Sequence, residues 1–417
     1  MKIAIASDIY YPMTNGVAVF SHNLANGLAA RGHEVMVICP SFDGKFHVDK
    51  EKNGVKTAHL TSTRFPFYPD QINDVPERKE FLGMTLPRTY YKNGIWWSTH
   101  PYGEIKKQLD DFQPDVIHLQ TAETIALAIV RYARKNKIPL VSTGHAYPDN
   151  VTGQFKFLKP VKKPVDAAVR AYMASFLKHS EYATAPTELA IEGLLPKDRK
   201  KFKVEVEALS NGVDLSQYNT HPPKKAILEK YQIKKGVPRV LYVGRVDPEK
   251  SIGVVVEAFS EAVKKVPEAE FLIVGDGIDR VNLEKKVEDL DLTEKVKFLG
   301  RIMPPDLLDI YKTGTLFATA SKTETQGIVL IEAAATGLPL VAVDAGAVKE
   351  LCQNQINGVL CRLGDVKGMA RAMVKILTDK ELQQKYSKAS LKIAKKHDIN
   401  YTLARLEEIY QIAIDTV

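Results

Sequence analysis

The sequence predicts an α/β fold with two doubly wound sheets of parallel strands. Short runs rich in Val, Ile and Leu alternate with stretches of helical periodicity, which is the pattern of parallel sheets covered by helices. A length of 417 residues fits two domains of about 200 residues each better than one core. A polar, Pro-containing stretch at residues 214–238 interrupts the alternation halfway. We therefore expect domains at residues 1–214 and 215–395, followed by a helix at residues 396–417.

The first domain begins with a strand and alternates strands with helices. Its strands are predicted at residues 2–7, 34–39, 115–118, 139–142 and 182–185. Helices are expected at residues 17–30 and 124–135, and the first of them stops before Gly32, as a helix end should.

The second domain repeats this order, and after residue 379 only helix is expected. Its strands are predicted at residues 240–243, 270–274, 295–299, 316–318, 340–343 and 358–361. In doubly wound sheets the loops after the carboxyl ends of the strands line the ligand crevice. Residues on these loops are therefore the candidates for a functional site.

Composition excludes several classes of protein. Hydrophobic residues make up 45% and charged residues 26%, and no apolar run approaches the roughly 20 residues of a membrane-spanning helix. The amino terminus is a short strand and not a signal peptide, so we expect a cytoplasmic protein. Cys39, Cys352 and Cys361 form no Cys-x-x-Cys pair, which argues against a disulfide framework and a zinc site and favours small core residues.

The loop at residues 8–16 leads from the first strand into the first helix, where free N–H groups could hold an anion. Asn15 and Gly16 suit a turn with positive φ that lets the backbone approach a phosphate. A plain strand-to-helix turn is the alternative interpretation.

Two further loops carry cations and glycines. Arg245 and Lys250 follow the strand that ends at Gly244, and both could grip a diphosphate on which negative charge grows as a sugar departs. Two solvated surface cations are the alternative. The next strand ends in Gly275, Asp276 and Gly277, which permit close approach to a ligand but lack the third glycine of a dinucleotide fingerprint.

Glu324 and Glu332 flank the start of a helix that Gly327 opens. Two carboxylates so placed can bind hydroxyls of two different sugars, while N–H groups at Gly327, Ile328 and Val329 remain for phosphate. Alternatively, Glu324 caps the helix and Glu332 faces solvent. The apolar flanks disfavour this alternative, because an unpaired buried glutamate is costly.

Six motifs in this order resemble glycosyltransferase family 4, the retaining nucleotide-sugar enzymes of GT-B fold, over nearly the whole chain. They are Tyr11-Pro12 with Asn15-Gly16-Val17, His145 after Ser142-Thr143-Gly144, Ser210-Asn211-Gly212-Val213-Asp214, Gly244-Arg245 with Glu249-Lys250, Gly275-Asp276-Gly277, and Glu324 with Glu332.

The resemblance implies two Rossmann-like domains facing a central cleft, with residues 396–417 packing back on the first. By the same resemblance Gly16 lies near the donor diphosphate, Arg245 and Lys250 bind it, Glu324 contacts the transferred sugar and Glu332 holds the ribose. His145 would line the sugar pocket, although a histidine after a strand is more often structural. The resemblance further implies retention without an obligatory covalent nucleophile, no tightly bound cofactor and no divalent metal. Asp289 and Asp291 are therefore interpreted as surface charge.

Within the family, the run Thr323-Glu324-Thr325-Gln326-Gly327 resembles bacterial diacylglycerol glucosyltransferases, as does Ala185-Pro186-Thr187-Glu188. The run His145-Ala146-Tyr147-Pro148 departs from their pattern. This resemblance implies transfer of a hexose, glucose above all, from a UDP-sugar to diacylglycerol or a glycosyl-diacylglycerol. A soluble sugar, phosphoinositol or polysaccharide-precursor acceptor is the alternative, and a sugar-nucleotide-binding protein without turnover is a second one.

Charge adds a prediction about location. The net charge is +8, and residues 156–203 hold eleven Lys or Arg against five Asp or Glu. A basic segment with interleaved aromatics can lie on an anionic membrane, so we expect a peripheral protein at the inner face of the plasma membrane. A solvated helix pair is the alternative. Trp96 and Trp97 are interpreted as a second contact with the membrane or the acceptor. Packing in the hydrophobic core is the alternative interpretation. No nucleic-acid recognition motif is present, and a monomer or weak dimer is expected. The membrane-side residues are Lys156, Lys159, Lys162, Lys163 and Arg170.

Overall fold

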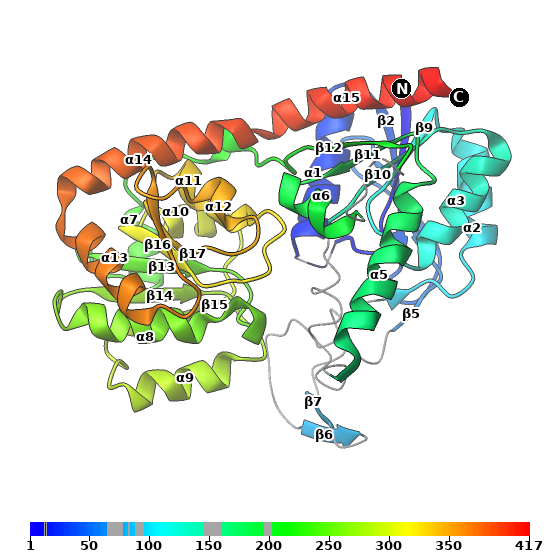
Figure 1. The fold of residues 1–417 in the computed structure, drawn as a ribbon. Helices are drawn as coiled ribbons and strands as arrows, with labels where there is room; N and C mark the ends of the chain where they lie inside the picture. The colour runs from blue at the N-terminus through cyan, green and yellow to red at the C-terminus, as the bar shows by residue number, and fades with distance from the viewer. Residues whose placement is uncertain are drawn as a thin grey trace. The chain divides into compact units, whose positions relative to one another are not determined.

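The protein is described by a computed structural model that covers residues 1–11, 13, 15–64, 78–81, 84–87, 96–145, 160–195 and 202–417. The chain forms two compact units. The first holds the described residues up to Gly212 together with Asn400–Val417, and the second holds Val213–Ile399. Figure 1 labels their elements.

The first unit contains an eight-stranded sheet in the order β12-β11-β10-β9-β1-β2-β4-β3. All its pairs are parallel except the β3–β4 hairpin. Its strands are β1 (Lys2–Ala6), β2 (Glu34–Pro40), β3 (His47–Lys50), β4 (Lys56–Leu60), β9 (Val116–Leu119), β10 (Leu140–Thr143), β11 (Tyr182–Ala185) and β12 (Glu205–Ala208).

Helices cover this sheet, and two short strand pairs lie outside it. The helices are α1 (Gly16–Ala30), α2 (Tyr102–Phe112), α3 (Thr124–Asn136), α5 (Lys162–Leu177), α6 (Glu188–Leu194) and α15 (Ile399–Thr416). The pairs are β5 (Thr63–Arg64) with β8 (Trp96–Trp97), and β6 (Arg78–Phe81) with β7 (Met84–Pro87).

The second unit contains a six-stranded, all-parallel sheet in the order β15-β14-β13-β16-β17-β18. Its strands are β13 (Arg239–Val243), β14 (Glu270–Val274), β15 (Val296–Gly300), β16 (Leu316–Thr319), β17 (Leu340–Val343) and β18 (Gly358–Cys361). Its helices are α7 (Lys225–Lys230), α8 (Ile252–Val263), α9 (Arg280–Asp289), α10 (Asp306–Tyr311), α11 (Ile328–Ala335), α12 (Val348–Leu351), α13 (Val366–Thr378) and α14 (Lys380–Ala394), with 3-10 turns at Leu215–Gln217, Pro248–Lys250 and Lys395–His397.

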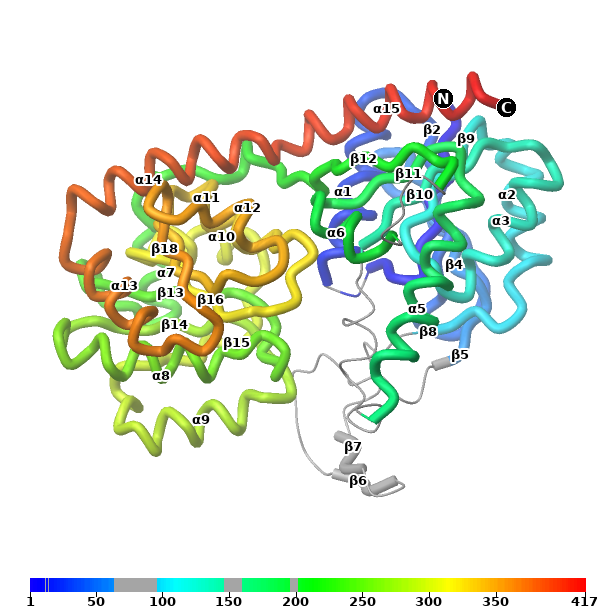
Figure 2. Tube along the Cα trace, in the orientation of Figure 1, coloured from blue at the N-terminus to red at the C-terminus, as the bar shows by residue number. Residues whose placement is uncertain are grey.

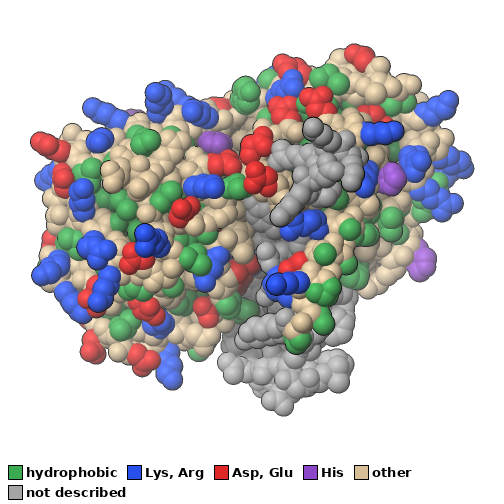
Figure 3. Space-filling model, in the orientation of Figure 1, with side chains coloured by type: hydrophobic (Ala, Val, Ile, Leu, Met, Phe, Trp, Pro, Cys, Tyr) green, Lys and Arg blue, Asp and Glu red, His purple; other side chains and the backbone are tan. Residues whose placement is uncertain are grey.

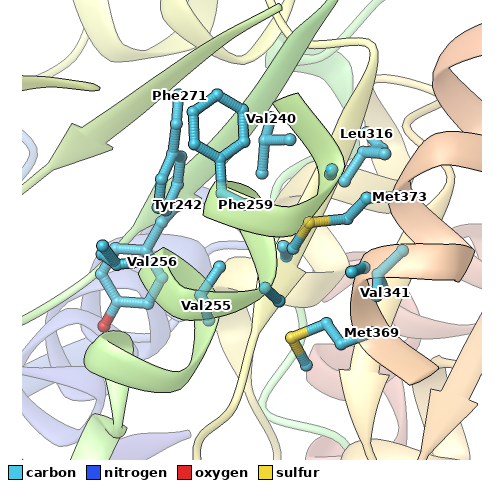
Figure 4. Close-up of a cluster of buried hydrophobic side chains, with 14 of the residues drawn as sticks. Val240, Tyr242, Val255, Val256, Phe259, Phe271, Leu316, Val341, Met369 and Met373 are labelled. Carbon is cyan, nitrogen blue, oxygen red and sulfur yellow. The ribbon is translucent and has the colours of Figure 1, made fainter. Parts of the chain in front are cut away.

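One of the hydrophobic clusters that form the core of the second unit lies between its sheet and the helix pair α8 and α13. Phe259 of α8 contacts Phe271 of β14 with ring centroids 5.5 Å apart, and Met369 and Met373 of α13 fill the space beside Val341 (Figure 4). These side chains are almost wholly shielded from solvent. Burial of each such side chain stabilises the fold by about 1.5–3 kcal/mol.

The predicted linker at residues 214–238 differs from the structure. Ile227 and Ile233 in this segment are buried in the core of the second unit, so the segment is part of that unit and not a free connection. The chain enters the second unit at Val213, which receives a hydrogen bond from Ile399 N and donates one to His397 O. Both ends of the second unit are therefore held together at Val213.

The chain end, α15, packs on the first unit. Leu403 lies so close to α1 that a Cβ added at Gly27 would lie 2.6 Å from it. Arg405 forms an ion pair of 2.8 Å with Glu207 of β12, and the Tyr410 hydroxyl lies 2.7 Å from His118 Nδ1 of β9. Figure 2 follows the chain into this helix.

Candidate functional site

The strand order of the second sheet reverses between β13 and β16. β14 and β15 lie on one side of β13, whereas β16, β17 and β18 lie on the other. Loops after the strands that flank such a reversal meet at one edge of the sheet. The loop after β13 carries Arg245 and Lys250, the loop after β14 carries Gly275 and Gly277, and the loop after β16 carries Glu324. The three motifs of the second domain are therefore neighbours.

The glycines of these loops let the loops pack on each other. Gly275 has φ of 130°, and a Cβ there would lie 1.8 Å from the carbonyl oxygen of Gly244, which itself has φ of 150°. A Cβ at Gly277 would lie 2.4 Å from the carbonyl oxygen of Val246. Asp276 accepts a hydrogen bond from Gly277 N over 2.9 Å. Close approach of chain to chain thus explains these glycines in the structure.

Lys250 and Glu324 form an ion pair across two of the loops. The Lys250 Nζ donates to Glu324 Oε1 over 2.7 Å, and both side chains are largely buried. Burial alone would raise the pKa of Glu324, but the Lys250 ammonium, the Ser321 hydroxyl and the charge of Arg245 together outweigh it, and the pKa ends below its ordinary value. Glu324 is therefore an ionised hydrogen-bond acceptor at neutral pH.

Arg245 lies beside this pair. Its guanidinium donates to the carboxylates of Asp247 and Glu249 on the same loop. Burial raises the pKa of Asp247, which Arg245 partly offsets. Two cations are thus gathered with three carboxylates. Such cations can transfer their hydrogen bonds to an incoming polyanion.

Glu332 of α11 is paired and does not face solvent, and Glu324 does not cap the helix, since α11 has no side-chain cap. Its Oε1 accepts from the Tyr218 hydroxyl at 3.1 Å and its Oε2 from the Tyr311 hydroxyl at 2.6 Å. Burial raises the pKa of Glu332 despite these two bonds. Gly327 opens α11 with φ of 86°. The first-turn N–H groups at Ile328 and Val329 have no acceptor within the helix, as at every helix start.

The first sheet reverses in the same way between β1 and β9, and a pocket lies at this place. Its empty volume is about 530 Å³, counting the space at its mouth. The walls are mostly apolar and come from the loop after β1, from α1, α5 and α6, and from the loops after β9 and β10. The apolar lining residues are Ile9, Val17, Leu119, Ala122, Met173, Phe176, Leu177 and Leu194.

His145 forms part of this pocket. Its Nε2 lies 2.8 Å from Gln120 Oε1, and its ring packs on Phe20 with centroids 5.3 Å apart. Burial lowers the pKa of His145 to about 3. The imidazole is therefore neutral, and an Nε2–H that donates to Gln120 Oε1 leaves Nδ1 as an acceptor.

The pocket also holds two buried polar atoms that have no partner among the described residues, Glu123 Oε2 and Gln120 Nε2. Burial, together with the charge of Asp8, raises the pKa of Glu123 to about 8. Asp8 itself accepts from Thr124 Oγ1 at 2.7 Å, Thr121 Oγ1 at 3.1 Å and Ile125 N at 3.1 Å. Because donors surround Asp8, whereas Glu123 Oε2 has no partner in the described part of the chain, Glu123 is the member of the pair that holds a proton.

Asp8, Gln120 and Glu123 were not predicted as site residues from the sequence. Only their positions in the sheet could have identified them, since Asp8 follows β1 and the other two follow β9, the two strands at which the strand order reverses.

The predicted turn with positive φ at Asn15 and Gly16 was wrong. Gly16 is the first residue of α1 and has no positive φ, and Asn15 has φ of −105° and caps the helix by accepting from Ala18 N over 3.0 Å. Asn15 and Gly16 thus start a helix and form no left-handed turn.

Two family models match the chain, one on each unit. The model described as Glycosyltransferase Family 4 matches residues 14–217, and the one described as Glycosyl transferases group 1 matches residues 223–393. The chain belongs to the family 4 glycosyltransferases. The matches leave only short ends and five residues between them unassigned, so both units of this glycosyltransferase have counterparts in the family.

Relatives of this family 4 glycosyltransferase act on different substrates. Alpha-monoglucosyldiacylglycerol synthases of Streptococcus pneumoniae and Acholeplasma laidlawii are 27% and 28% identical over 86% and 82% of the chain and 75% and 80% of their own lengths. A GDP-mannose-dependent alpha-mannosyltransferase of Mycobacterium tuberculosis is 26% identical over 88% of the chain and 85% of its own length.

Solved structures show the fold. A sucrose-phosphate synthase from Thermosynechococcus elongatus superposes with a TM-score of 0.78 at 17% identity, covering both chains completely. Anabaena Alr3699/HepE in complex with UDP-glucose superposes with a TM-score of 0.71 at 18% identity over 99% of both chains. The predicted GT-B architecture of this glycosyltransferase is confirmed.

The structure describes three of the five basic residues that were predicted to face the membrane. Lys156 and Lys159 lie outside the described residues, whereas Lys162, Lys163 and Arg170 are on α5. The Lys162 ammonium pairs with Asp166 at 2.5 Å. On the face drawn in Figure 3, Lys and Arg are spread among Asp and Glu over the second unit. Among the described helices, none has the length and hydropathy to cross a bilayer.

Three further predictions concern residues that the structure describes. The cysteines Cys39, Cys352 and Cys361 are free and buried, as expected of small core residues. Asp289 and Asp291 are exposed, as expected of surface charge. Trp97 is 36% exposed and Trp96 is partly buried, both in the short strand β8.

Proposed function

We propose that this glycosyltransferase moves glucose from UDP-glucose, with retention, to a lipid that carries a hydroxyl group, diacylglycerol or a glycosyl-diacylglycerol. The observation that carries the proposal is the pocket of the first unit, whose walls are apolar and which holds Glu123 and Gln120 with unpartnered polar atoms. A lipid acceptor needs both properties, since its chains are apolar and its reacting group is a hydroxyl.

The donor is proposed to bind the loops of the second unit. Arg245 and Lys250 would exchange their carboxylate partners for the diphosphate, and the N–H groups at Gly327, Ile328 and Val329 would add donors. Glu324, ionised and freed from Lys250, would accept from sugar hydroxyls. Glu332 would hold the ribose beside Tyr218 and Tyr311. The loops Asn15-Gly16, at the start of α1, and Gly244 with Gly275-Asp276-Gly277 would complete the donor site.

The proposed reaction breaks the bond between the sugar C1 and the phosphate oxygen and forms a bond from C1 to the acceptor oxygen on the same face. The acceptor proton passes to the departing phosphate, so no covalent enzyme intermediate and no tightly bound cofactor is invoked. Charge grows on the departing phosphate, and fixed cations at Arg245 and Lys250 stabilise it more in the transition state than in the ground state. These two cations take the place that a divalent metal would have.

The acceptor is proposed to lie in the pocket with its apolar part against α5 and α6. A protonated Glu123 donates one hydrogen bond, and Gln120 Nε2 can donate another, so both atoms would gain a partner in the complex. His145 would face the transferred sugar, where Nδ1 is free to accept from a sugar hydroxyl. The names of the glucosyldiacylglycerol synthases among the relatives support this class of acceptor.

Membrane attachment is proposed through residues 162–173 of α5. Residues 162–173 of α5 are exposed or only partly buried, and they include Lys163, Arg170 and Tyr172, which is 44% exposed; Val161, just before the helix, is 48% exposed. Cations near an anionic surface contribute about 1 kcal/mol each to binding. We propose a monomer or weak dimer at the inner face of the plasma membrane.

A panel of donors and acceptors tests the proposal. The purified chain is incubated with UDP-glucose, UDP-galactose or GDP-mannose and with diacylglycerol, glucosyl-diacylglycerol, a soluble sugar or inositol phosphate, and products are separated by mass. Transfer from UDP-glucose to either lipid is the expected result. Transfer only to a soluble acceptor contradicts the lipid assignment, and tight donor binding without turnover on any acceptor contradicts the enzyme assignment.

A further inference from the structure

Three metal-binding side chains meet on one face of the β3–β4 hairpin, in the first unit. His47 and His59 are directly opposite each other in the antiparallel register, and Asp49 follows His47 by two residues on the same face. Asp49 Oδ2 lies 3.4 Å from His59 Nε2 and 3.8 Å from His47 Nε2. One ligand atom from each residue lies within 4.8 Å of the other two. No other group of three such residues is found in the described part of the chain.

The other ring nitrogens have partners that orient these ligands. His47 Nδ1 lies 3.0 Å from the carbonyl oxygen of Lys45, and His59 Nδ1 lies 3.6 Å from the sulfur of buried Cys39. Both partners can accept a hydrogen bond from an Nδ1–H, which leaves the lone pair on Nε2. An outer partner on the second nitrogen is the usual arrangement of a metal-binding histidine.

The hairpin is anchored in the sheet, which fixes the backbone of the three ligand residues. β4 pairs with β2 on one side and β3 on the other, and the His59 side chain is only 14% exposed. The two rings are stacked nearly parallel, 4.3 Å apart, so one must turn before both lone pairs converge on an ion. His47, with a side chain 40% exposed, has room to turn, and the exposed Asp49 can follow.

We propose that His47, Asp49 and His59 bind a Zn²⁺ ion that clamps the β3–β4 hairpin at the edge of the first sheet. Two imidazoles and a carboxylate are ligands that Zn²⁺ favours, and solvent supplies the fourth. Mg²⁺ prefers an all-oxygen octahedral shell and is not expected to bind here. The absence of a Cys-x-x-Cys pair, which argued against a zinc site, does not bear on a site built from histidines. The site is separate from the proposed transfer reaction.

Calorimetric titration of the chelator-treated, tag-free full chain with Zn²⁺ tests the site. We expect one ion per chain, an affinity at least ~10-fold weaker in His47→Ala and in His59→Ala, and no change in His179→Ala, an exposed histidine of the same unit. Zn²⁺ should raise the melting temperature of the wild type and of His179→Ala, whereas Mg²⁺ should not.

Two results would overturn the site. One is equal Zn²⁺ affinity in the wild type and the His47→Ala/His59→Ala double variant. The other is a Co²⁺ spectrum with a thiolate charge-transfer band, which would place the ion on a cysteine. Melting of all variants without metal shows that they fold, and neither readout depends on transferase activity.

Discussion

At the scale of single residues, the ion pair between Lys250 and Glu324 is the clearest arrangement of the second unit. The two side chains come from loops after β13 and β16, and each is mostly shielded from water. An ammonium so placed satisfies Glu324 when no donor is bound and can turn to a diphosphate when one arrives. The pair therefore prepares both groups for the proposed donor.

Replacing Lys250 by Met should lower kcat/KM for transfer by about 100- to 1,000-fold, the usual loss when one fixed contact to a developing charge is removed. Lys264→Met is the control, because Lys264 is an exposed lysine of the same unit that pairs with Glu261 on the surface. Steady-state kinetics with varied UDP-glucose measure the effect. A Lys250→Met enzyme as active as the control would remove Lys250 from the donor site.

Glu123 makes stability depend on pH. Its pKa is raised from 4.5 to about 8, so between these values the folded chain keeps a proton that the unfolded chain has lost. Raising the pH through this window therefore favours unfolding, and the free energy of unfolding should fall up to about pH 8 and then level off.

In Glu123→Gln this decline should be smaller, whereas Glu192→Gln, at an exposed glutamate of α6, should leave it unchanged. Urea denaturation at a series of pH values measures it. The same pH profile in wild type and Glu123→Gln would show that Glu123 is ionised at neutral pH.

At the scale of elements, the strands were predicted well where they are buried and apolar. β11, β14, β17 and β18 have the predicted bounds, because parallel strands covered on both faces are continuous apolar runs. β3, β4 and β12 of the first sheet were missed, since their sequences His47–Lys50, Lys56–Leu60 and Glu205–Ala208 are largely polar or alternating. β3 and β12 lie at the two ends of the sheet and β4 lies next to β3.

The glycine loops between these strands carry a prediction about stability. Gly275→Ala should lower the free energy of unfolding by about 3 kcal/mol or more, because the added Cβ overlaps the carbonyl oxygen of Gly244 and φ is 130°. Gly253→Ala in α8 is the matched control, since its Cβ meets only ordinary contacts. That control should be neutral or stabilising by about 0.4–1 kcal/mol. Chemical denaturation compares the two, and similar stabilities would refute the tight loop packing.

At the scale of the whole molecule, the chain closes the first unit with its last helix. Leu406 is 1% exposed and Tyr410 is fully buried against that unit. Leu406→Ala should cost about 2–5 kcal/mol of stability, whereas Tyr401→Ala, at a residue 63% exposed on the same helix, should change it by less than about 0.5 kcal/mol. Scanning calorimetry checks both, and equal melting curves would show that α15 adds little to the first unit.

The donor motifs were visible in the sequence because glycines, cations and carboxylates recur after strands. The acceptor pocket was not visible in the sequence, since Asp8 lies 112 residues before Gln120 and 115 before Glu123, and the three form no local motif. Only the strand order, with β1 beside β9, brings them together. The structure also explains Gly275 and Gly277 by the close packing of neighbouring loops, which the sequence alone does not show.

Analysis of the lipid product tests the central claim most directly. The full chain is incubated with UDP-glucose and vesicles that contain diacylglycerol and anionic lipid, and the glycolipid is isolated and its anomeric coupling constant measured by NMR. We predict a glucosyl lipid with the α configuration of the donor. A β-linked product would contradict retention, and the absence of any glucosylated lipid, with transfer to a soluble acceptor instead, would contradict the lipid pocket.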